Sequence, residues 1–264
     1  MPSTRVERMI NDVPVRVTEV PDARGVIVAE AGTLGTPRHM DILADHLATQ
    51  GFTTVALGPL AHADHVGEHA ARIQSVVELA RAEHPNLPLG VVGSSLGADS
   101  VLFWRGLHGT SGTPVVALNP VILEKMLPWG DRVKVGASLL SSRLGLRHVG
   151  TPMSLGIPLT DNPASLEFAG NLVNPSSMTV ESGLFGDTAK MAGSIAAHSR
   201  GDHGAVAVAL AGADQVALNL ASKGMAKLLG AEVWKVPGAA HDLSQLAGPE
   251  VATRIADFVL MAAR

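Results

Sequence analysis

Residues 89–98 have the sequence LGVVGSSLGA, and this stretch decides the fold. An apolar run typical of a buried strand, Leu89–Gly93, leads directly into a helical pattern at Leu96–Leu107. Between them, residues 93–97 fit the motif G-x-S-x-G with Ser95 at the centre. A serine at such a sharp turn has strained backbone angles and tolerates only small residues two positions away. The stretch therefore predicts an exposed nucleophilic serine, and its alternative is an ordinary Gly/Ser-rich turn.

Two residues farther along the chain are candidates to activate Ser95. A serine hydroxyl is a weak nucleophile unless a histidine takes its proton, and the histidine needs a third group to orient it. Asp214 follows the predicted strand Ala205–Ala211, and His241 follows the predicted strand Ala231–Val236. The ends of these strands should share one sheet edge with Ser95. We therefore predict a Ser95–His241–Asp214 triad; the alternatives are a helix N-cap for Asp214 and a loop or cap residue for His241.

Strand and helix patterns alternate along most of the chain. Eight strands are predicted, at Arg5–Ile10, Val13–Glu19, Gly25–Glu30, Phe52–Leu57, Leu89–Gly93, Pro114–Leu118, Ala205–Ala211 and Ala231–Val236. Helices are predicted near Arg38–Gln50, Val66–Glu83, Leu96–Leu107, Gln215–Leu229 and Leu243–Met261. The first two strands should form a hairpin at Asn11-Asp12, because these residues tolerate positive φ. The alternation predicts an α/β fold, with a mostly parallel eight-stranded sheet covered by helices on both faces.

The stretch from residue 121 to residue 203 breaks this alternation. It is rich in Gly, Pro, Ser and Met and has weak helical patterns at Pro163–Leu172 and Ser177–Ala197. We predict that residues 121–203 form an inserted helical lid on a core made of residues 1–120 and 204–264. The lid is apolar, which favours an apolar substrate group, although part of it must pack on the core. Its apolar side chains include Met153, Leu155, Ile157, Leu159, Leu166, Phe168, Leu172, Met178, Leu184, Phe185 and Met191.

Composition excludes several classes of function. The 264 residues are 46% hydrophobic and 17% charged, as in a globular protein with a large core. The net charge of −4 comes without any basic run, so no nucleic-acid partner is expected. The absence of cysteine excludes disulfides, thiolate zinc sites and a cysteine nucleophile. Residues 1–21 do not have the pattern of a signal peptide, and no apolar stretch approaches the roughly 20 residues of a membrane span, so we expect a soluble cytoplasmic protein.

These motifs resemble the α/β-hydrolase superfamily along nearly the whole chain, and within it the lid-bearing esterases, lipases and thioesterases of the monoglyceride-lipase kind. The resemblance implies a serine hydrolase that cleaves a carboxylic ester or thioester through an acyl-enzyme, without cofactor or metal. It also aligns residues 31–33 with the loop that forms the oxyanion hole, so the implied donors are the backbone N–H groups of Thr33 and Leu96. Ala31 stands where that family has histidine, and Gly58 stands where an aspartate usually follows the fourth strand.

Other residue patterns suggest competing chemistry. Residues 65–69 match the zinc motif H-x-x-E-H, in which His65 and His69 would bind the metal and Glu68 would act as base, but no third ligand is evident. His62 is expected to border the mouth of the active site. A serine at position 95 excludes the aspartate nucleophile of haloalkane and epoxide hydrolases, and the lack of tyrosine removes the usual epoxide-polarising group.

Three further side chains allow both a structural and a functional interpretation. For Glu30, at a strand end, a solvated or hydrogen-bonded carboxylate is favoured over a pocket residue. For Trp104 and Trp129, packing in the core is favoured over lining an acyl pocket. A different class of function also stays open, because the same fold serves acyltransferases, lyases, isomerases and binding proteins that use the same pocket.

Overall fold

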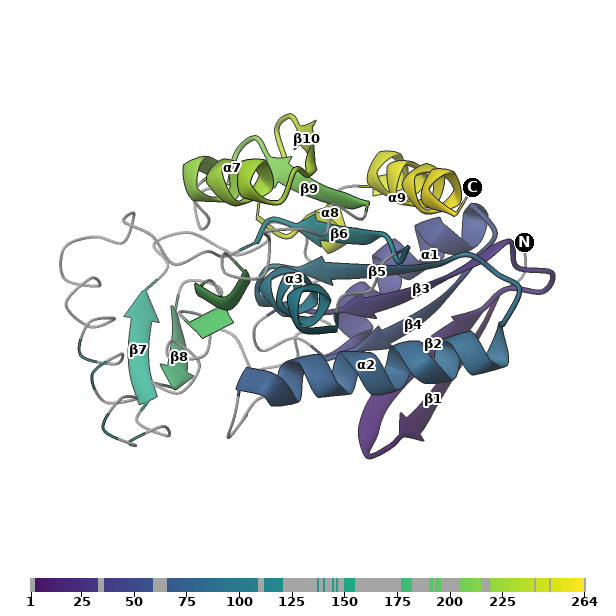
Figure 1. Cartoon of the computed structure of the whole chain (residues 1–264), viewed down its shortest axis with the longest axis horizontal. Coiled ribbons are helices and arrows are strands. Elements are labelled where there is room, and N and C mark those ends of the chain that lie inside the picture. Colours follow the sequence, from purple (N-terminus) through teal and green to yellow (C-terminus); the bar gives the residue numbers. More distant parts are fainter. Residues whose placement is uncertain are drawn as a thin grey trace.

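The computed structural model describes residues 3–32, 36–58, 66–108, 112–120, 150–154, 177–181, 205–214, 219–239, 241–246 and 248–263, together with a few residues between 137 and 195. Within this part of the chain, eight strands form one sheet in the order β1-β2-β4-β3-β5-β6-β9-β10 (Figure 1). Their bounds are Thr4–Ile10 (β1), Val13–Glu19 (β2), Gly25–Glu30 (β3), Phe52–Leu57 (β4), Leu89–Ser94 (β5), Val115–Leu118 (β6), Val206–Ala211 (β9) and Glu232–Val236 (β10). The eight predicted strands are thereby confirmed.

The direction of the strands follows the prediction as well. The hairpin β1–β2 is antiparallel, with Asn11 (φ 46°) and Asp12 (φ 64°) at its turn. Both angles are positive, as the favoured two-residue hairpin turn requires. β2 is antiparallel to β4, and every other neighbouring pair is parallel. Parallel strands place their carboxyl ends at a common edge, where sites of α/β proteins are built.

Helices cover both faces of the sheet. On one face lie α1 (Asp41–Thr49) and α9 (Gly248–Ala262); on the other lie α2 (Val66–Glu83), α3 (Leu96–His108) and α7 (Asn219–Leu228) (Figure 1). Alternation along β3 makes this arrangement possible, because Val26 and Val28 pack toward α2 and α3 while Ile27 and Ala29 pack toward α1 and α9. Both faces are apolar, so the strands are buried on either side.

Two predicted helices differ in detail. The helix predicted near Arg38–Gln50 begins as a short 3₁₀ turn, η1 (Pro37–Met40), before α1. The helix predicted near Leu243–Met261 is wrong as one element: it is divided into α8 (Leu243–Leu246) and α9. Gly248 has φ 58° and is followed by Pro249, and neither a positive φ nor a missing N–H fits a continuous helix. Residues 215–218 of the predicted helix before α7 lie outside the described residues.

The predicted lid is described in part only. Its described residues include an antiparallel pair of strands, β7 (Gly150–Ser154) and β8 (Ser177–Glu181), drawn at the left of Figure 1. The helix predicted at Ser177–Ala197 is therefore wrong over Ser177–Glu181, where strand pairing has overridden a weak helical pattern. The helical pattern at Pro163–Leu172 lies outside the described residues, and the assignment of residues 121–203 as a lid stays a prediction.

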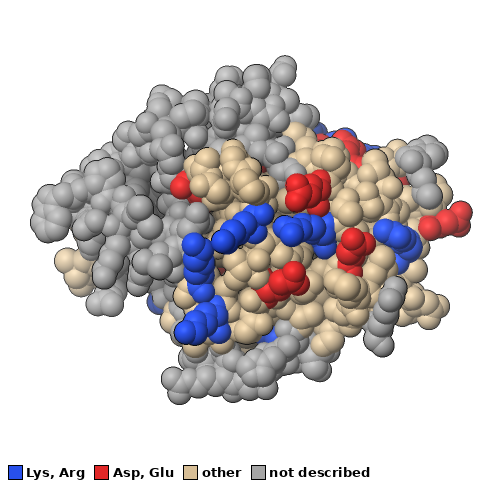
Figure 2. All heavy atoms as spheres, turned by 90° about the horizontal axis from the view of Figure 1, so that it is seen from above, with Lys and Arg blue, Asp and Glu red and all other residues tan. Residues whose placement is uncertain are grey.

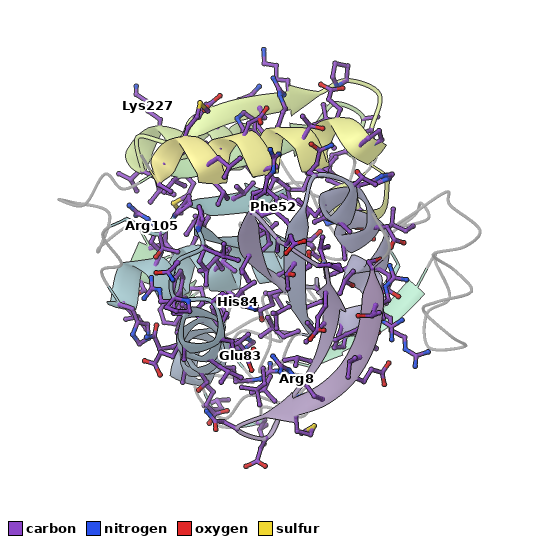
Figure 3. The ribbon with its side chains drawn as sticks, turned by 90° about the vertical axis from the view of Figure 1, so that its right-hand side faces the viewer. Arg8, Phe52, Glu83, His84, Arg105 and Lys227 are labelled. Atoms are coloured by element: carbon purple, nitrogen blue, oxygen red, sulfur yellow. The ribbon has the colours of Figure 1, made fainter. Side chains whose placement is uncertain are left out.

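Ion pairs tie the N-terminal hairpin to the rest of the domain. The Arg8 guanidinium of β1 donates to both carboxylate oxygens of Glu83 at the end of α2, over 3.0 and 2.6 Å (Figure 3). Glu7 accepts from Arg16 and from Arg38 of η1, and Arg16 also donates to Asp41 of α1. The exposed pairs, Arg8–Glu83 and Arg38–Glu7, each contribute at most about 1 kcal/mol, whereas Asp41 in the Arg16 pair is buried. The pairs that include Arg38 and Asp41 attach η1 and the start of α1 to the hairpin.

The surface formed by α7, β10 and α9 carries both signs of charge, side by side in the view from above (Figure 2). Its exposed charged side chains include Lys223, Lys227, Glu232, Lys235, Glu250, Arg254 and Asp257. Mixed signs give this face no single-sign field of the kind that nucleic-acid phosphates need. Among the described residues, no helix has both the length and the apolar character to cross a membrane.

Candidate active site

Ser95 lies at the tight turn between β5 and α3. Its φ is +55°, a conformation that residues other than glycine rarely adopt, and its backbone N–H donates to the carbonyl oxygen of Leu118 over 2.9 Å. This bond continues the pairing of β5 with β6 past the end of the strand. Because α3 begins at Leu96, the positive end of its dipole is directed at Ser95. The turn thus holds the Ser95 side chain at the sheet edge in a strained, defined conformation.

Close packing explains why the residues two positions from Ser95 are glycines. A Cβ added to Gly93 would lie 2.1 Å from the carbonyl oxygen of Gly97, across the turn. A Cβ added to Gly97 would lie 2.4 Å from the carbonyl oxygen of Glu30, at the end of β3. Both distances are far below van der Waals contact, and the atoms met are backbone atoms. The sequence motif therefore reflects a three-way contact between the turn, the start of α3 and the end of β3.

His241 and Asp214 lie within hydrogen-bond distance of one another and of Ser95. Nε2 of His241 is 2.9 Å from Oγ of Ser95, and Nδ1 of His241 is 2.9 Å from Oδ2 of Asp214. The loops that carry them are joined by backbone bonds from Gly212 N–H to Val236 C=O (2.8 Å) and from Ala213 N–H to Ala239 C=O (2.9 Å). The structure thus brings together the three residues singled out as a triad from the sequence.

Burial determines what this chain of hydrogen bonds can do. The Asp214 side chain is fully buried and that of His241 is 6% exposed. A buried carboxylate is stable only when it is paired, and Asp214 has the imidazole Nδ1 as its partner. With the proton on Nδ1 directed at Asp214, the free lone pair of Nε2 faces the Ser95 hydroxyl. In this tautomer His241 can accept the Ser95 proton, which is the arrangement that makes a serine nucleophilic.

The loop after β3 passes directly beside Ser95. A Cβ added to Gly32 would lie 2.9 Å from Cβ of Ser95 and 3.6 Å from its Oγ. Thr33, for which an oxyanion-hole role was expected, lies outside the described residues. Leu96, the other expected donor, is the first residue of α3, and the first N–H groups of a helix have no carbonyl partner within that helix. Gly32, the last described residue before Thr33, therefore lies beside the nucleophile.

The competing metal motif gains no support from the described residues. His62 and His65 lie outside them, and His69 is buried on α2 at 1% exposure. Among the residues that the structure describes, no group of three or more His, Asp and Glu side chains could hold a metal ion. Trp104 is fully buried in the core, and its indole N–H donates to Gln74 over 2.8 Å. Trp129 lies outside the described part of the chain.

Glu30 differs from its expected environment. It was expected to be solvated or hydrogen-bonded, but it is fully buried and neither carboxylate oxygen has a hydrogen-bond partner among the described residues. Burial raises the pKa of Glu30 well above its ordinary value, and the charge of Arg72 on α2 lowers it by a smaller amount. Burial in turn lowers the pKa of Arg72, against the opposing charge of Glu30. Burial thus favours the protonated, neutral form of this carboxyl.

Asn119 is a residue that reasoning from the sequence missed. It follows β6 and precedes Pro120, a combination that resembles any turn. Its side chain is buried and bonds to the backbone of His241 and of Ala211 at the end of β9. The available signal was its position at the carboxyl end of a strand between those that carry Ser95 and Asp214.

Comparison with solved structures identifies the architecture. A monoacylglycerol lipase of Paleococcus ferrophilus matches with a TM-score of 0.72 at 18% identity, over 99% of this chain and 100% of that one. A soluble variant of monoglyceride lipase from Saccharomyces cerevisiae, in complex with a substrate analog, matches with a TM-score of 0.74 at 14% identity, over 100% and 96%. A thioesterase domain from the curacin biosynthetic pathway matches with a TM-score of 0.62 at 13% identity, over 99% and 100%.

No protein-family model and no curated protein sequence matches this chain. The likeness to solved structures nevertheless extends over nearly the full length of both chains in each comparison. The chain therefore has the α/β-hydrolase fold, as the resemblance noted from the sequence implied.

Proposed function

We propose that this protein is a serine hydrolase that cleaves the carboxylic ester or thioester of an apolar small molecule through an acyl-enzyme. The observation that carries the proposal is the hydrogen-bonded chain Ser95–His241–Asp214, with 2.9 Å at each link and a serine of positive φ at its end. The α/β-hydrolase fold of lipases, esterases and a thioesterase supports the same reaction class. The apolar composition of residues 121–203 supports an apolar substrate.

The proposed reaction proceeds in two halves. Oγ of Ser95 attacks the carbonyl carbon while His241 Nε2 accepts its proton, and Asp214 stabilises the resulting imidazolium. The tetrahedral oxyanion is bound by the N–H groups of Leu96 and Thr33, each worth about 3–4 kcal/mol in reactions of this type. His241 then returns the proton to the departing alcohol or thiol, which leaves the acyl group on Ser95. Water, deprotonated by His241, attacks the acyl-enzyme and releases the acid and the free serine.

Replacing the serine tests the proposal. S95A should abolish hydrolysis of an activated short-chain ester and prevent covalent labelling by a fluorophosphonate, because no other group can form the acyl-enzyme. Ser100 offers a matched control, since it is a buried serine on the same helix whose hydroxyl donates to Leu96 C=O over 3.1 Å. S100A should keep both activities, measured as ester turnover and as probe incorporation by mass spectrometry. Turnover that survives in folded S95A would refute the assignment.

A product analysis separates hydrolysis from the other chemistries that this fold supports. Adding an alcohol or amine to the reaction should divert part of the acyl group if an acyl-enzyme forms. A dominant transfer product at low acceptor concentration would identify an acyltransferase. Wild-type protein that neither turns over a panel of esters and thioesters nor reacts with the probe at Ser95 would favour a binding protein.

A further inference from the structure

Asn119 lies between the strands that carry the proposed triad. It directly follows β6, which is placed between β5 and β9 in the sheet, and its own N–H continues the ladder by donating to Ala209 C=O over 2.9 Å. The residue is 1% exposed and has φ 47°. Asparagine tolerates a positive φ better than most residues, and a buried carboxamide requires hydrogen-bond partners for its N–H and C=O groups. Its side chain is therefore a candidate for a specific task at this edge.

The carboxamide of Asn119 makes two short hydrogen bonds to backbone groups. Its Nδ2–H donates to the carbonyl oxygen of His241 over 2.5 Å, and its Oδ1 accepts from the N–H of Ala211 over 2.7 Å. One neighbour is an acceptor and the other a donor, so the orientation of the amide is determined by its partners. Ala211 is the last residue of β9, three positions before Asp214. A single side chain thus connects the loop of the acid to the backbone of the histidine.

The carbonyl of His241 is held by two donors, the Asn119 amide and the N–H of Leu243 over 3.0 Å. The Gly212–Val236 and Ala213–Ala239 bonds join the acid loop to the histidine loop, but they do not reach β6. The Asn119 bond is different because it connects His241 to the end of β6, the strand beside β5, which leads to Ser95. The imidazole has to reach Ser95 and Asp214 at the same time, so a small displacement of the His241 backbone lengthens at least one of those bonds.

We propose that Asn119 is a positioning residue of the triad, whose carboxamide fixes the backbone of His241 against the end of β9 so that the imidazole spans Asp214 and Ser95. The inference rests on the proposed function of that triad. Asn119 needs no contact with the substrate for this role. Its loss should therefore slow the chemical step and leave substrate binding unchanged.

Two substitutions keep the backbone conformation while removing the bond. N119D retains the shape and tolerates positive φ, but places an oxygen where the His241 carbonyl needs a donor. N119G also tolerates positive φ and removes both side-chain bonds. Ser222 on α7 provides the matched control, because its buried hydroxyl donates to Pro120 C=O over 3.1 Å, one residue from Asn119, without touching His241. S222A removes a buried hydrogen bond at the same junction.

The experiment measures kcat and KM for an activated ester and the rate constant of fluorophosphonate labelling at Ser95, each normalised to the fraction of enzyme that can be labelled. For N119D we expect kcat and the labelling rate constant to fall about 100-fold, as for a catalytic group displaced by about an ångström. Both rate constants should also fall for N119G, and KM should change by less than about threefold in both variants. The kcat of S222A should stay within about threefold of the wild-type value. This should hold even if its melting temperature falls as far as those of N119D and N119G.

The possible outcomes separate this inference from the proposed function. Wild-type protein that is not labelled at Ser95 removes the proposed triad, and the role of Asn119 with it. Labelled wild type together with N119D and N119G that react at the wild-type rate overturns the positioning role alone. A rise in KM equal to the loss in kcat/KM, or N119G that does not fold where S222A folds, also overturns it, because Asn119 would then serve substrate binding or folding.

Discussion

The chemistry of single residues at this site is set by burial. The side chain of Asp214 is fully buried beside the imidazole, whereas the carboxylate of Asp242, the residue after His241, accepts a hydrogen bond from Ser244 over 2.5 Å. Two aspartates thus lie near one histidine, and only Asp214 bonds to the imidazole Nδ1. A carboxylate shielded from water holds the imidazole tautomer far more firmly than one that water can solvate. The two residues therefore allow a paired test.

We expect D214N to lower kcat by about 10⁴-fold, because an amide can donate to Nδ1 and so stabilise the tautomer whose Nε2 proton blocks proton transfer from Ser95. D242N should keep most of the activity, since its amide oxygen can still accept from Ser244. Steady-state kinetics on an activated ester, with circular dichroism as the check on folding, makes the comparison. Equal losses in the two variants would show that charge near His241, and not the Asp214 bond, is what matters.

Among single residues, the sequence predicted the three members of the proposed triad but not the buried residues Asn119 and Glu30 around them. Ser95, Asp214 and His241 could be singled out because nucleophilic catalysis requires those residue types in that chain order after strands. Asn119 was missed because its partners are backbone groups of Ala211 and His241, which leave no pattern in a sequence beyond the position of Asn119 after a strand. The environment of Glu30 was wrong because a strand end usually meets water, whereas here α2 and α3 cover it.

At the scale of elements, the end of β3 and the start of α3 are in direct backbone contact. Gly97 makes this possible, since an added Cβ would lie 2.4 Å from Glu30 C=O and 2.6 Å from Ala31 C=O. Such contact cannot relax through a side-chain rotation, because both carbonyl oxygens are backbone atoms at and just after the end of β3. Gly224 on α7 is the opposite case, with no atom within 4 Å of an added Cβ.

Replacing glycine by alanine should therefore change the free energy of unfolding in opposite directions on α3 and α7. We expect G97A to lower the free energy of unfolding by about 1–3 kcal/mol through overpacking, and to abolish most activity by separating α3 from β3. G224A should raise the free energy of unfolding by about 0.5–1 kcal/mol, because alanine loses less backbone entropy in a helix. Denaturant titration of both variants measures these changes. Stability of G97A equal to that of the wild type would contradict the contact.

Strands were easier to predict from the sequence than helix ends. Each buried parallel strand is a short apolar run between turn residues, so its bounds stand out. β8 was missed because a pair of short strands outside the main sheet depends on a partner 27 residues earlier, β7, and no local pattern announces it. The break between α8 and α9 follows from Gly248 and Pro249, and it was missed because the apolar period continues across it.

At the scale of the whole molecule, the core has an apolar cluster on each face of the sheet. Glu30 belongs to the face that α2 and α3 cover, where Val26 and Val28 of the same strand are fully buried. A carboxyl group without hydrogen bonds costs least in such a place when it carries a proton. Stability of the entire fold is then linked to the protonation of one residue.

The sign of this linkage follows from the direction of the shift. The unfolded chain releases the Glu30 proton near the ordinary pKa of 4.5, whereas burial raises the pKa in the folded state well above that value. Below about pH 4.5 both states hold the proton, and between the two pKa values only the folded state does. The free energy of unfolding should therefore fall as pH rises through this window, by up to about 1.4 kcal/mol per pH unit, until the raised pKa is passed.

E30Q isolates this contribution, because glutamine has nearly the same shape and does not titrate. The stability of E30Q relative to wild type should grow as pH rises above about 4.5, measured by denaturant unfolding at several pH values. E83Q is the control: Glu83 is exposed and paired with Arg8, so its replacement should cost less than about 1 kcal/mol throughout. A difference between E30Q and wild type that is independent of pH would mean that folded Glu30 releases its proton as readily as the unfolded chain does. In that case Arg72 would compensate the buried charge, and the α2 face of the core would hold an ion pair in place of a neutral acid.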